Sequence, residues 1–238
     1  MMIEADPAIA TAAIWQRLAD DHGTTVAYPT LRAYVTSRRT AGKTPGDREN
    51  AWQQRPRLIY DPLMASQGPH SGLIIEVPEA EPAVRHHREH LDANAPLGIP
   101  AHITVLYPFM PPETIDPSAL SRLRQLFAGA SRFRFRLHHT DWFGDDVLWL
   151  APQDPRPFRA LTQRVFRAYP AFPPFDGRFG EVVPHLTIGH GHPLDDLRTA
   201  ESSVKARLPI ESSAAAVTLM TQQSAEGHWT KTATFPLQ

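Results

Sequence analysis

Two short segments of the chain, HITV at residues 102–105 and HLTI at residues 185–188, repeat one pattern of polar and apolar residues. In each segment a histidine stands two positions before a threonine, and the intervening and following residues are apolar. Because residues i and i+2 of a β-strand point to the same face, each segment presents one imidazole and one hydroxyl to the same side. The composition predicts roughly 0.16 copies of this motif by chance, so its double occurrence indicates a shared chemical role.

The chemistry that suits these side chains is proton transfer at a phosphoester. An imidazole with a pKa of about 6.5 exists in both its neutral and its protonated form near neutral pH. Two of them on opposite sides of a phosphorus atom, here His102 and His185, can deprotonate water and protonate the departing alkoxide. The hydroxyls of Thr104 and Thr187 can donate hydrogen bonds to the non-bridging oxygens, where negative charge develops. This chemistry requires no metal ion and no cofactor.

The apolar periodicity predicts strands and helices that alternate around the two motifs. The order strand, helix, histidine-bearing strand, helix recurs about 80 residues later, which an approximate internal duplication explains. Asp116 and Asp154, each followed by a proline, are the expected N-caps of two helices. The expected strands cover residues 73–77, 102–107, 133–138, 147–150 and 185–188, with a closing hairpin at 215–221 and 230–235. The expected helices cover residues 81–93, 117–128, 155–169 and 194–208.

Residues 72–238 are therefore expected to form one α+β domain. Its duplicated halves predict a bilobal fold with two antiparallel sheets and flanking helices around a central cleft. The two histidine-bearing strands would line this cleft from opposite lobes.

With these motifs, residues 72–236 resemble the two-histidine (2H) phosphoesterase superfamily, specifically its 2′-5′ RNA ligase and RNA 2′,3′-cyclic phosphodiesterase group. The resemblance implies that His102 is the acid and His185 the base, and that Thr104 and Thr187 hold the phosphate. It also implies an enzyme that opens 2′,3′-cyclic phosphates of RNA ends or small nucleotides to 2′-phosphomonoesters. Ligation of RNA ends through a 2′-5′ linkage would be the reverse reaction.

Two further residues are candidates for the cleft. Tyr107 ends the first histidine-bearing strand, and His190 closely follows the second motif. Relatives often carry an arginine at the position of His190. An imidazole would hold a phosphate less firmly than a guanidinium group, which bears on the identity of the substrate more than on the class of reaction.

Other polar clusters allow two interpretations each. His86 and His90 share one face of an expected helix, where a solvated surface is the simpler interpretation and a metal site of a metal-dependent hydrolase is the alternative. Arg132, Arg134 and Arg136 form a basic strip on one strand face. This strip either contacts an RNA backbone or protects an exposed strand from edge pairing.

The N-terminal part differs in character from the rest. Residues 1–39 are predicted as a helix-turn-helix-like pair of helices and residues 40–71 as a linker. The stretch IWQRLADDHGTTVAYPTLRAYVTSRR resembles the N-terminal DNA-binding segment of insertion-sequence transposases, which implies DNA as a partner of residues 8–39. A DNA- or RNA-binding module with a non-catalytic phosphoesterase-like scaffold is therefore the alternative function. If the domain instead starts at Met64, the upstream residues are a fusion or a start-site artefact.

The composition of the 238 residues narrows the function classes. The chain has 24 basic and 25 acidic residues, a net charge of −1, and no cysteine. This balance argues against a nucleic-acid coat or a membrane-surface protein, and the lack of cysteine excludes disulfides and a thiol nucleophile. No apolar run approaches the ~18 residues of a membrane helix. We therefore expect a cytoplasmic protein that has no membrane partner and acts on a short substrate.

Overall fold

The computed structural model of the chain describes residues 69–177, 182–224 and 226–238. The segment predicted as helix-turn-helix-like, Met64 and the linker up to residue 68 lie outside these residues. The first strand, β1, begins at His70, two residues before the predicted domain boundary. No helix in the described part of the chain is long and apolar enough to cross a membrane.

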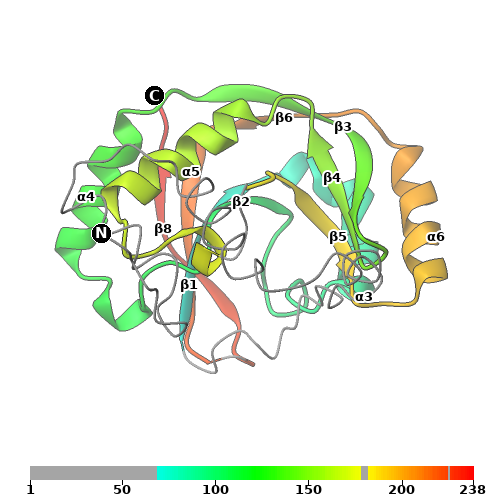
Figure 1. Ribbon diagram of the computed structural model, residues 1–238, viewed down its shortest axis with the longest axis horizontal. Helices are drawn as coiled ribbons and strands as arrows, with labels where there is room; N and C mark the ends of the chain where they lie inside the picture. Colours follow the sequence, from blue (N-terminus) through cyan, green and yellow to red (C-terminus); the bar gives the residue numbers. More distant parts are fainter. Residues whose placement is uncertain (1–68, 178–181, 225) are drawn as a thin grey trace, which may run out of the picture. The chain divides into compact units, whose positions relative to one another are not determined.

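The strands form two four-stranded antiparallel sheets (Figure 1). The first sheet has the strand order β2-β1-β7-β8 and the second has the order β5-β4-β3-β6. With the helices that flank the sheets, this confirms the expected α+β fold class. The strands are β1 (His70–Glu76), β2 (His102–Leu106), β3 (Phe133–Phe143), β4 (Val147–Pro152), β5 (Leu186–His190), β6 (Ile210–Ala214), β7 (Ala216–Gln222) and β8 (Trp229–Pro236).

The helices lie where the sequence predicts them, with small shifts at their ends. Asp116 caps α4 as expected, because its Oδ1 accepts a hydrogen bond of 2.6 Å from the backbone N–H of Ala119. Asp154 instead accepts from the backbone N–H of Arg156, and α5 begins one residue later than predicted. The α-helices are α3 (Glu81–Leu91), α4 (Pro117–Ala128), α5 (Arg156–Ala168) and α6 (Leu194–Lys205). The 3₁₀ helices are η3 (Pro78–Ala80), η4 (Pro112–Thr114) and η5 (Pro174–Gly177).

The duplication is present, but the two sheets are not built from consecutive halves of the chain. The first two positions of the two sheets hold corresponding strands, because β5 corresponds to β2 and β4 corresponds to β1. The third position is exchanged, because β3 pairs with β4 in the second sheet and β7 pairs with β1 in the first. The helices cross over as well, since α3 packs on β5 and α5 packs on β2. The lobes expected from the sequence are therefore intertwined.

Two strands, β3 and β6, differ most from the sequence prediction. β3 continues to Phe143, five residues beyond the predicted end at residue 138. Its first half, Phe133–Leu137, which carries Arg134 and Arg136, pairs with β6, and its second half, Leu137–Phe143, pairs with β4. Both interpretations of the arginines therefore stay predictions. β6 was not predicted, because Ile210, Ser212 and Ala214 alternate inward with only one large apolar side chain among them.

One hydrophobic core joins both sheets and their helices. Phe127 of α4 and Phe235 of β8 stack with ring centroids 5.6 Å apart, and both are fully buried. Phe158 of α5 meets the rings of Phe133 and Phe135 of β3 edge-on at 5.0 Å. Each such fully buried ring stabilises the fold by about 1.5–3 kcal/mol. Because this core is shared, it fixes β2 and β5, which contact each other, in one relative position.

Candidate active site

The two histidine–threonine motifs lie on strands with the side-chain alternation that the sequence predicts. In β2, His102 and Thr104 are half-buried, whereas Ile103 and Val105 point into the core. In the second motif, His185 directly precedes β5, and Thr187 is half-buried between two core residues. The contact between β2 and β5 brings the motifs together. His102 and His185 are close enough that the charge of His185 lowers the pKa of His102.

Both imidazoles are held by the same backbone contact. Nδ1 of His102 lies 2.8 Å from the carbonyl oxygen of Pro100, and Nδ1 of His185 lies 2.7 Å from that of Val183. A carbonyl only accepts hydrogen bonds, so each Nδ1 carries the proton and donates it. In the neutral ring this leaves the lone pair on Nε2. The two rings therefore have matched tautomers, and Nε2 is the atom available for proton transfer.

A β-bulge lies at the fourth residue of each motif. Val105 is the extra residue of β2, because Thr104 and Leu106 pair with consecutive residues of β1. Ile188 is the extra residue of β5 in the same way. Each bulge turns the residue three positions after the threonine, Tyr107 or His190, to the face of the motif. Both sequence-predicted cleft candidates thus occupy equivalent positions.

Burial makes both imidazoles harder to protonate than a histidine in water. It lowers the pKa of His102 to about 4, and the Arg88 guanidinium contributes in the same direction. The hydrogen bond to Pro100 and the charge of Asp92 oppose this shift. Burial also lowers the pKa of His185, against the opposing effect of its hydrogen bond to Val183.

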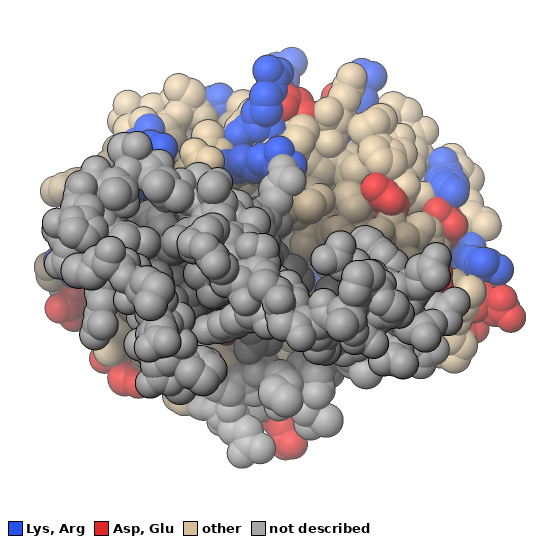
Figure 2. All heavy atoms as spheres, in the orientation of Figure 1, with Lys and Arg blue, Asp and Glu red and all other residues tan. Residues whose placement is uncertain are grey.

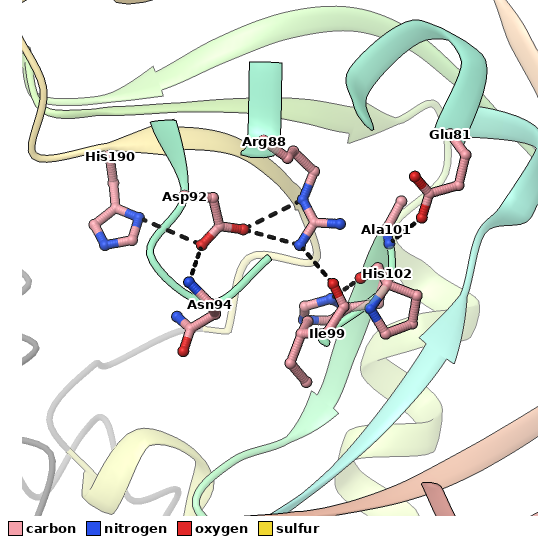
Figure 3. A network of polar contacts seen from close by, with 9 residues as sticks. Glu81, Arg88, Asp92, Asn94, Ile99, Ala101, His102 and His190 are labelled. Atoms are coloured by element: carbon pink, nitrogen blue, oxygen red, sulfur yellow. Dashed lines mark hydrogen bonds and ion pairs between the residues drawn. The ribbon is translucent and has the colours of Figure 1, made fainter. Parts of the chain in front are cut away.

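Arg88 and Asp92 form a buried ion pair next to His102 (Figure 3). Nη2 of Arg88 lies 2.9 Å from Oδ2 of Asp92, and the two side chains are only 3% and 5% exposed. The other carboxylate oxygen accepts from the backbone N–H of Asn94 and lies 4.0 Å from Nδ1 of His190. The network therefore connects α3 with His190, at the end of β5.

The same helix positions the segment that leads into β2. Arg88 donates to the carbonyl oxygen of Ile99 at 3.2 Å, and Oε1 of Glu81 accepts from the backbone N–H of Ala101 at 2.8 Å (Figure 3). These contacts hold the three residues before His102 at two points. On the other side, α3 approaches β5 closely at Gly189, where a Cβ atom would lie 2.6 Å from that of Leu91. Only glycine fits this contact.

Aromatic side chains surround His185. The ring of Phe143 stacks on that of Trp149 with centroids 4.8 Å apart and meets the His185 ring edge-on at 5.0 Å. Trp149 pairs with Thr187 across β4 and β5, so the two side chains share a face. Phe143 is 37% exposed, whereas Trp149 is buried and its Nε1 has no hydrogen-bond partner among the described residues.

Polar side chains instead surround His102 on the first sheet. Glu76 pairs with His102 across β1 and β2 and accepts hydrogen bonds from Thr218 and Lys231 at 2.6 and 3.0 Å. Burial alone would raise the pKa of Glu76, but these two hydrogen bonds lower it below its usual value. Glu76 is therefore an anion paired with the ammonium group of Lys231.

The threonines of the two motifs are available to a ligand. Among the described residues, neither the Thr104 nor the Thr187 hydroxyl forms a hydrogen bond with another group. Thr162 shows the contrast, because its buried hydroxyl donates to the carbonyl oxygen of Val105 at 2.7 Å. The motif hydroxyls can therefore donate to a phosphate oxygen without first breaking a contact within the protein.

Sequence reasoning missed Arg88 and Asp92, the buried ion pair that α3 places beside His102. Their spacing of four residues is also typical of exposed ion pairs on helix surfaces, so the sequence held no sign of their burial. The described residues include one group with the spacing of metal ligands, His86, Glu89 and His90, on the exposed side of α3. It is separate from the two motifs.

Comparison with solved structures finds proteins of low sequence identity. E. coli LigT complexed with NADP+ is 18% identical with a TM-score of 0.45, over 72% of this chain and 99% of that chain. E. coli LigT complexed with 3′-AMP is 18% identical with a TM-score of 0.46, over 71% and 98%. The protein TT0787 of Thermus thermophilus is 18% identical with a TM-score of 0.46, over 71% and 97%.

Comparison with curated proteins finds no match. A family model described as the 2′-5′ RNA ligase superfamily matches residues 76–226, which is more than half of the chain and includes both motifs. The chain therefore belongs to the 2′-5′ RNA ligase superfamily.

Proposed function

We propose that this chain is a metal-independent phosphoesterase that opens 2′,3′-cyclic phosphates of nucleotides or short RNA ends to 2′-phosphomonoesters. The matched pair of imidazoles carries this proposal. His102 and His185 each donate from Nδ1 to a backbone carbonyl and present Nε2 at a face that also holds a threonine hydroxyl. Membership of the 2′-5′ RNA ligase superfamily supports chemistry at a phosphoester.

In the proposed reaction, a water oxygen attacks phosphorus while the Nε2 lone pair of one imidazole accepts a proton from that water. The bond between phosphorus and O3′ breaks on the opposite side, and Nε2–H of the other, protonated imidazole supplies a proton to O3′. The product has a 2′-phosphate and a free 3′-hydroxyl. Exchange of protons with solvent then restores both rings. A 5′-hydroxyl in place of the water would give a 2′-5′ linkage.

The surrounding charges favour His102 as the base for hydrolysis. Burial and the Arg88 cation both lower the pKa of His102, so this ring is neutral and keeps its Nε2 lone pair. Among the causes of the lower pKa of His185 there is no neighbouring cation of this kind, and we assign this ring as the acid. These assignments are the reverse of those that the family resemblance implies.

Thr104 and Thr187 would hold the phosphate between the two rings. As the water attacks, negative charge builds up on the non-bridging oxygens, and a hydroxyl that donates to them stabilises the transition state. The two hydroxyls come from different sheets, so both sides of the phosphate can be contacted.

The aromatic residues near His185 favour a substrate that carries a base. Phe143 exposes a ring beside His185, and stacking of a nucleobase on such a ring contributes about 1–3 kcal/mol. Charge favours a short substrate, since residues 72–238 contain 16 basic and 18 acidic residues. On the face drawn in Figure 2, basic and acidic side chains are interspersed around the edge, with some Lys and Arg atoms grouped near α5.

The experiment that tests this function is hydrolysis of a panel of 2′,3′-cyclic nucleotides by the full chain in the presence of EDTA. We expect conversion to 2′-phosphomonoesters that EDTA leaves unchanged. His102→Ala and His185→Ala should each lower the rate by about 10²–10⁴-fold, because each removes one proton transfer. His138→Ala, on the exposed side of β3, is the matched control and should retain full activity.

Three results would contradict parts of the proposal. Full activity of either alanine variant would exclude that histidine from proton transfer, and loss of activity in EDTA would indicate a metal-dependent hydrolase. No hydrolysis of any cyclic phosphate together with tight binding of DNA or RNA would favour the alternative function, a binding module on a non-catalytic scaffold.

A further inference from the structure

Helix α3 carries a second cluster of histidines that the proposed hydrolysis does not use. His86, Glu89 and His90 are exposed, and their potential ligand atoms all lie within 4.8 Å of one another. The spacing i, i+3 and i+4 places the three side chains on one face of the helix. This face is exposed, whereas the other side of α3, which carries Arg88, is buried.

The local contacts prepare the two imidazoles to bind one ion. Nδ1 of His90 lies 2.7 Å from the carbonyl oxygen of His86 and therefore carries the proton. This leaves the lone pair of His90 on Nε2, the atom that a metal ion needs. The rings of His86 and His90 are already neighbours, with centroids 4.8 Å apart.

A surface pocket of about 330 Å³ adjoins these residues, between α3 and α6. Its walls contain further imidazole and carboxylate groups, from α3 and from the start of α6. The polar residues that line it include His86, His87, His90, His192 and Asp196. Of these, His192 and Asp196 come from the start of α6 and the residues before it.

We propose that His86, Glu89 and His90 form a binding site for a divalent transition-metal ion of the Zn²⁺ class. Two imidazoles and one carboxylate suit Zn²⁺, Ni²⁺ and Cu²⁺, whereas Mg²⁺ and Ca²⁺ prefer oxygen ligands alone. Two histidines at i and i+4 on one helical face are a known arrangement for Zn²⁺. A tetrahedral site separates its ligand atoms by about 3.4 Å, whereas the potential ligand atoms here lie within 4.8 Å of one another. The exposed side chains can rotate to bring these atoms closer together.

The fourth position would be taken by water or by His192 across the pocket. In either case the three ligands lie on one face only when the helix is folded. The ion therefore binds the folded chain and not the unfolded one. Binding of this kind stabilises the folded protein by mass action. The site is independent of the proposed hydrolysis, and neither inference depends on the other.

Calorimetric titration of the full chain, without an affinity tag, with ZnCl₂ tests the site. We expect one Zn²⁺ per chain and a higher melting temperature in its presence. His86→Ala and His90→Ala should each weaken Zn²⁺ binding by at least about tenfold, and MgCl₂ should give no binding. His138→Ala is the matched control, because His138 belongs to another exposed pair of neighbouring histidines, on β3.

Melting temperatures in EDTA check that the alanine variants fold, since the side chains changed on α3 and β3 lie at the surface. Unchanged Zn²⁺ affinity in the His90→Ala variant would overturn the proposal. Loss of Zn²⁺ binding in His102→Ala or His185→Ala, with normal binding in His86→Ala and His90→Ala, would also overturn it, because the ion would then lie at the other histidine pair.

Discussion

The two histidine–threonine motifs have the same backbone geometry but different surroundings. In both, Nδ1 of the histidine donates to the carbonyl oxygen two residues earlier, and the threonine hydroxyl is open to a ligand. In both, a bulge after the threonine returns Tyr107 or His190 to the same face. The contacts that position the two imidazoles and the two hydroxyls are therefore duplicated.

The groups around each imidazole are not duplicated. His102 has charged neighbours, with the Arg88–Asp92 pair on one side and Glu76 with Lys231 on the other. His185 instead meets the rings of Phe143 and Trp149. Equivalent backbone positions thus hold two imidazoles in different surroundings, one beside charged groups and one beside aromatic rings.

The largest expected effect concerns the buried ion pair on the charged side. Arg88→Met leaves the Asp92 carboxylate buried without its partner, which should lower the free energy of unfolding by about 3–5 kcal/mol. The double variant Arg88→Met/Asp92→Leu removes both charges and should recover most of this loss. Urea unfolding followed by tryptophan fluorescence measures the change.

The exposed pair of Arg136 and Glu211 on β3 and β6 provides the control. Arg136→Met should leave the free energy of unfolding nearly unchanged, because solvent screens this pair. If Arg88→Met and Arg136→Met have the same free energy of unfolding, the buried ion pair of Arg88 and Asp92 does not stabilise the surroundings of His102.

A second prediction tests what the two motifs share. Thr104→Val and Thr187→Val keep the shape of the side chain but remove the hydroxyl. Each should lower kcat/KM by about 10–100-fold, since a hydrogen bond to a charged group contributes about 1.5–3 kcal/mol. Steady-state kinetics on a 2′,3′-cyclic nucleotide measure the effect.

Thr199→Val, on the exposed side of α6, should leave the kinetics unchanged, and Thr104→Ser should retain most of the activity. A loss in only one of the two valine variants would show that the phosphate is held from one sheet alone. The motifs would then differ in function as well as in surroundings.

The sequence was sufficient to predict the faces of the motifs, because alternation within a strand is a local property. His102 and Thr104 point away from Ile103 and Val105 as their spacing requires. The bulges were not predictable, since nothing in the identity of Val105 or Ile188 marks an extra residue. In a regular strand, Tyr107 and His190 would point to the opposite face.

The surroundings of His102 depend on contacts between distant segments, and these were beyond sequence reasoning. Arg88 and Asp92 are buried because α3 packs closely on β5 at Gly189, which lies about 100 residues further along the chain. The exchange of β3 and β7 between the sheets has the same origin. Pairing partners are chosen by the whole fold, and β6, with its serines, carried no local signal.

On the aromatic side, Phe143→Ala should raise KM for a 2′,3′-cyclic nucleotide by about fivefold to tenfold with little change in kcat. The variant removes the exposed ring beside His185, and stacking of a base contributes about 1–3 kcal/mol. Phe143→Tyr retains the ring and should behave like the unaltered chain. A ribose 2′,3′-cyclic phosphate without a base should show no difference between these proteins. Sensitivity of that substrate to Phe143→Ala would mean that the ring supports His185 rather than the base.

The smallest expected effect, a shift in pH dependence, tests whether the charged neighbours make His102 the ring with the lower pKa. Both pKa values lie below the usual 6.5 of histidine, so the optimum of kcat/KM should lie below pH 6.5. The acidic limb of the profile reports the lower of the two pKa values and the alkaline limb the higher, whichever ring is the base. Arg88 lowers the pKa of His102 more than Asp92 raises it, so the Arg88→Met/Asp92→Leu variant should have a His102 of higher pKa.

If His102 has the lower pKa of the two rings, the acidic limb of this double variant moves to higher pH and the alkaline limb stays. Asp92→Asn should move the acidic limb to lower pH, because it removes the negative charge that favours protonated His102. If the alkaline limb moves instead, His102 has the higher pKa of the two rings, and its charged neighbours do not make it the ring that stays neutral. Movement of neither limb would mean that the difference between the two sides serves the binding of phosphate and base rather than proton transfer.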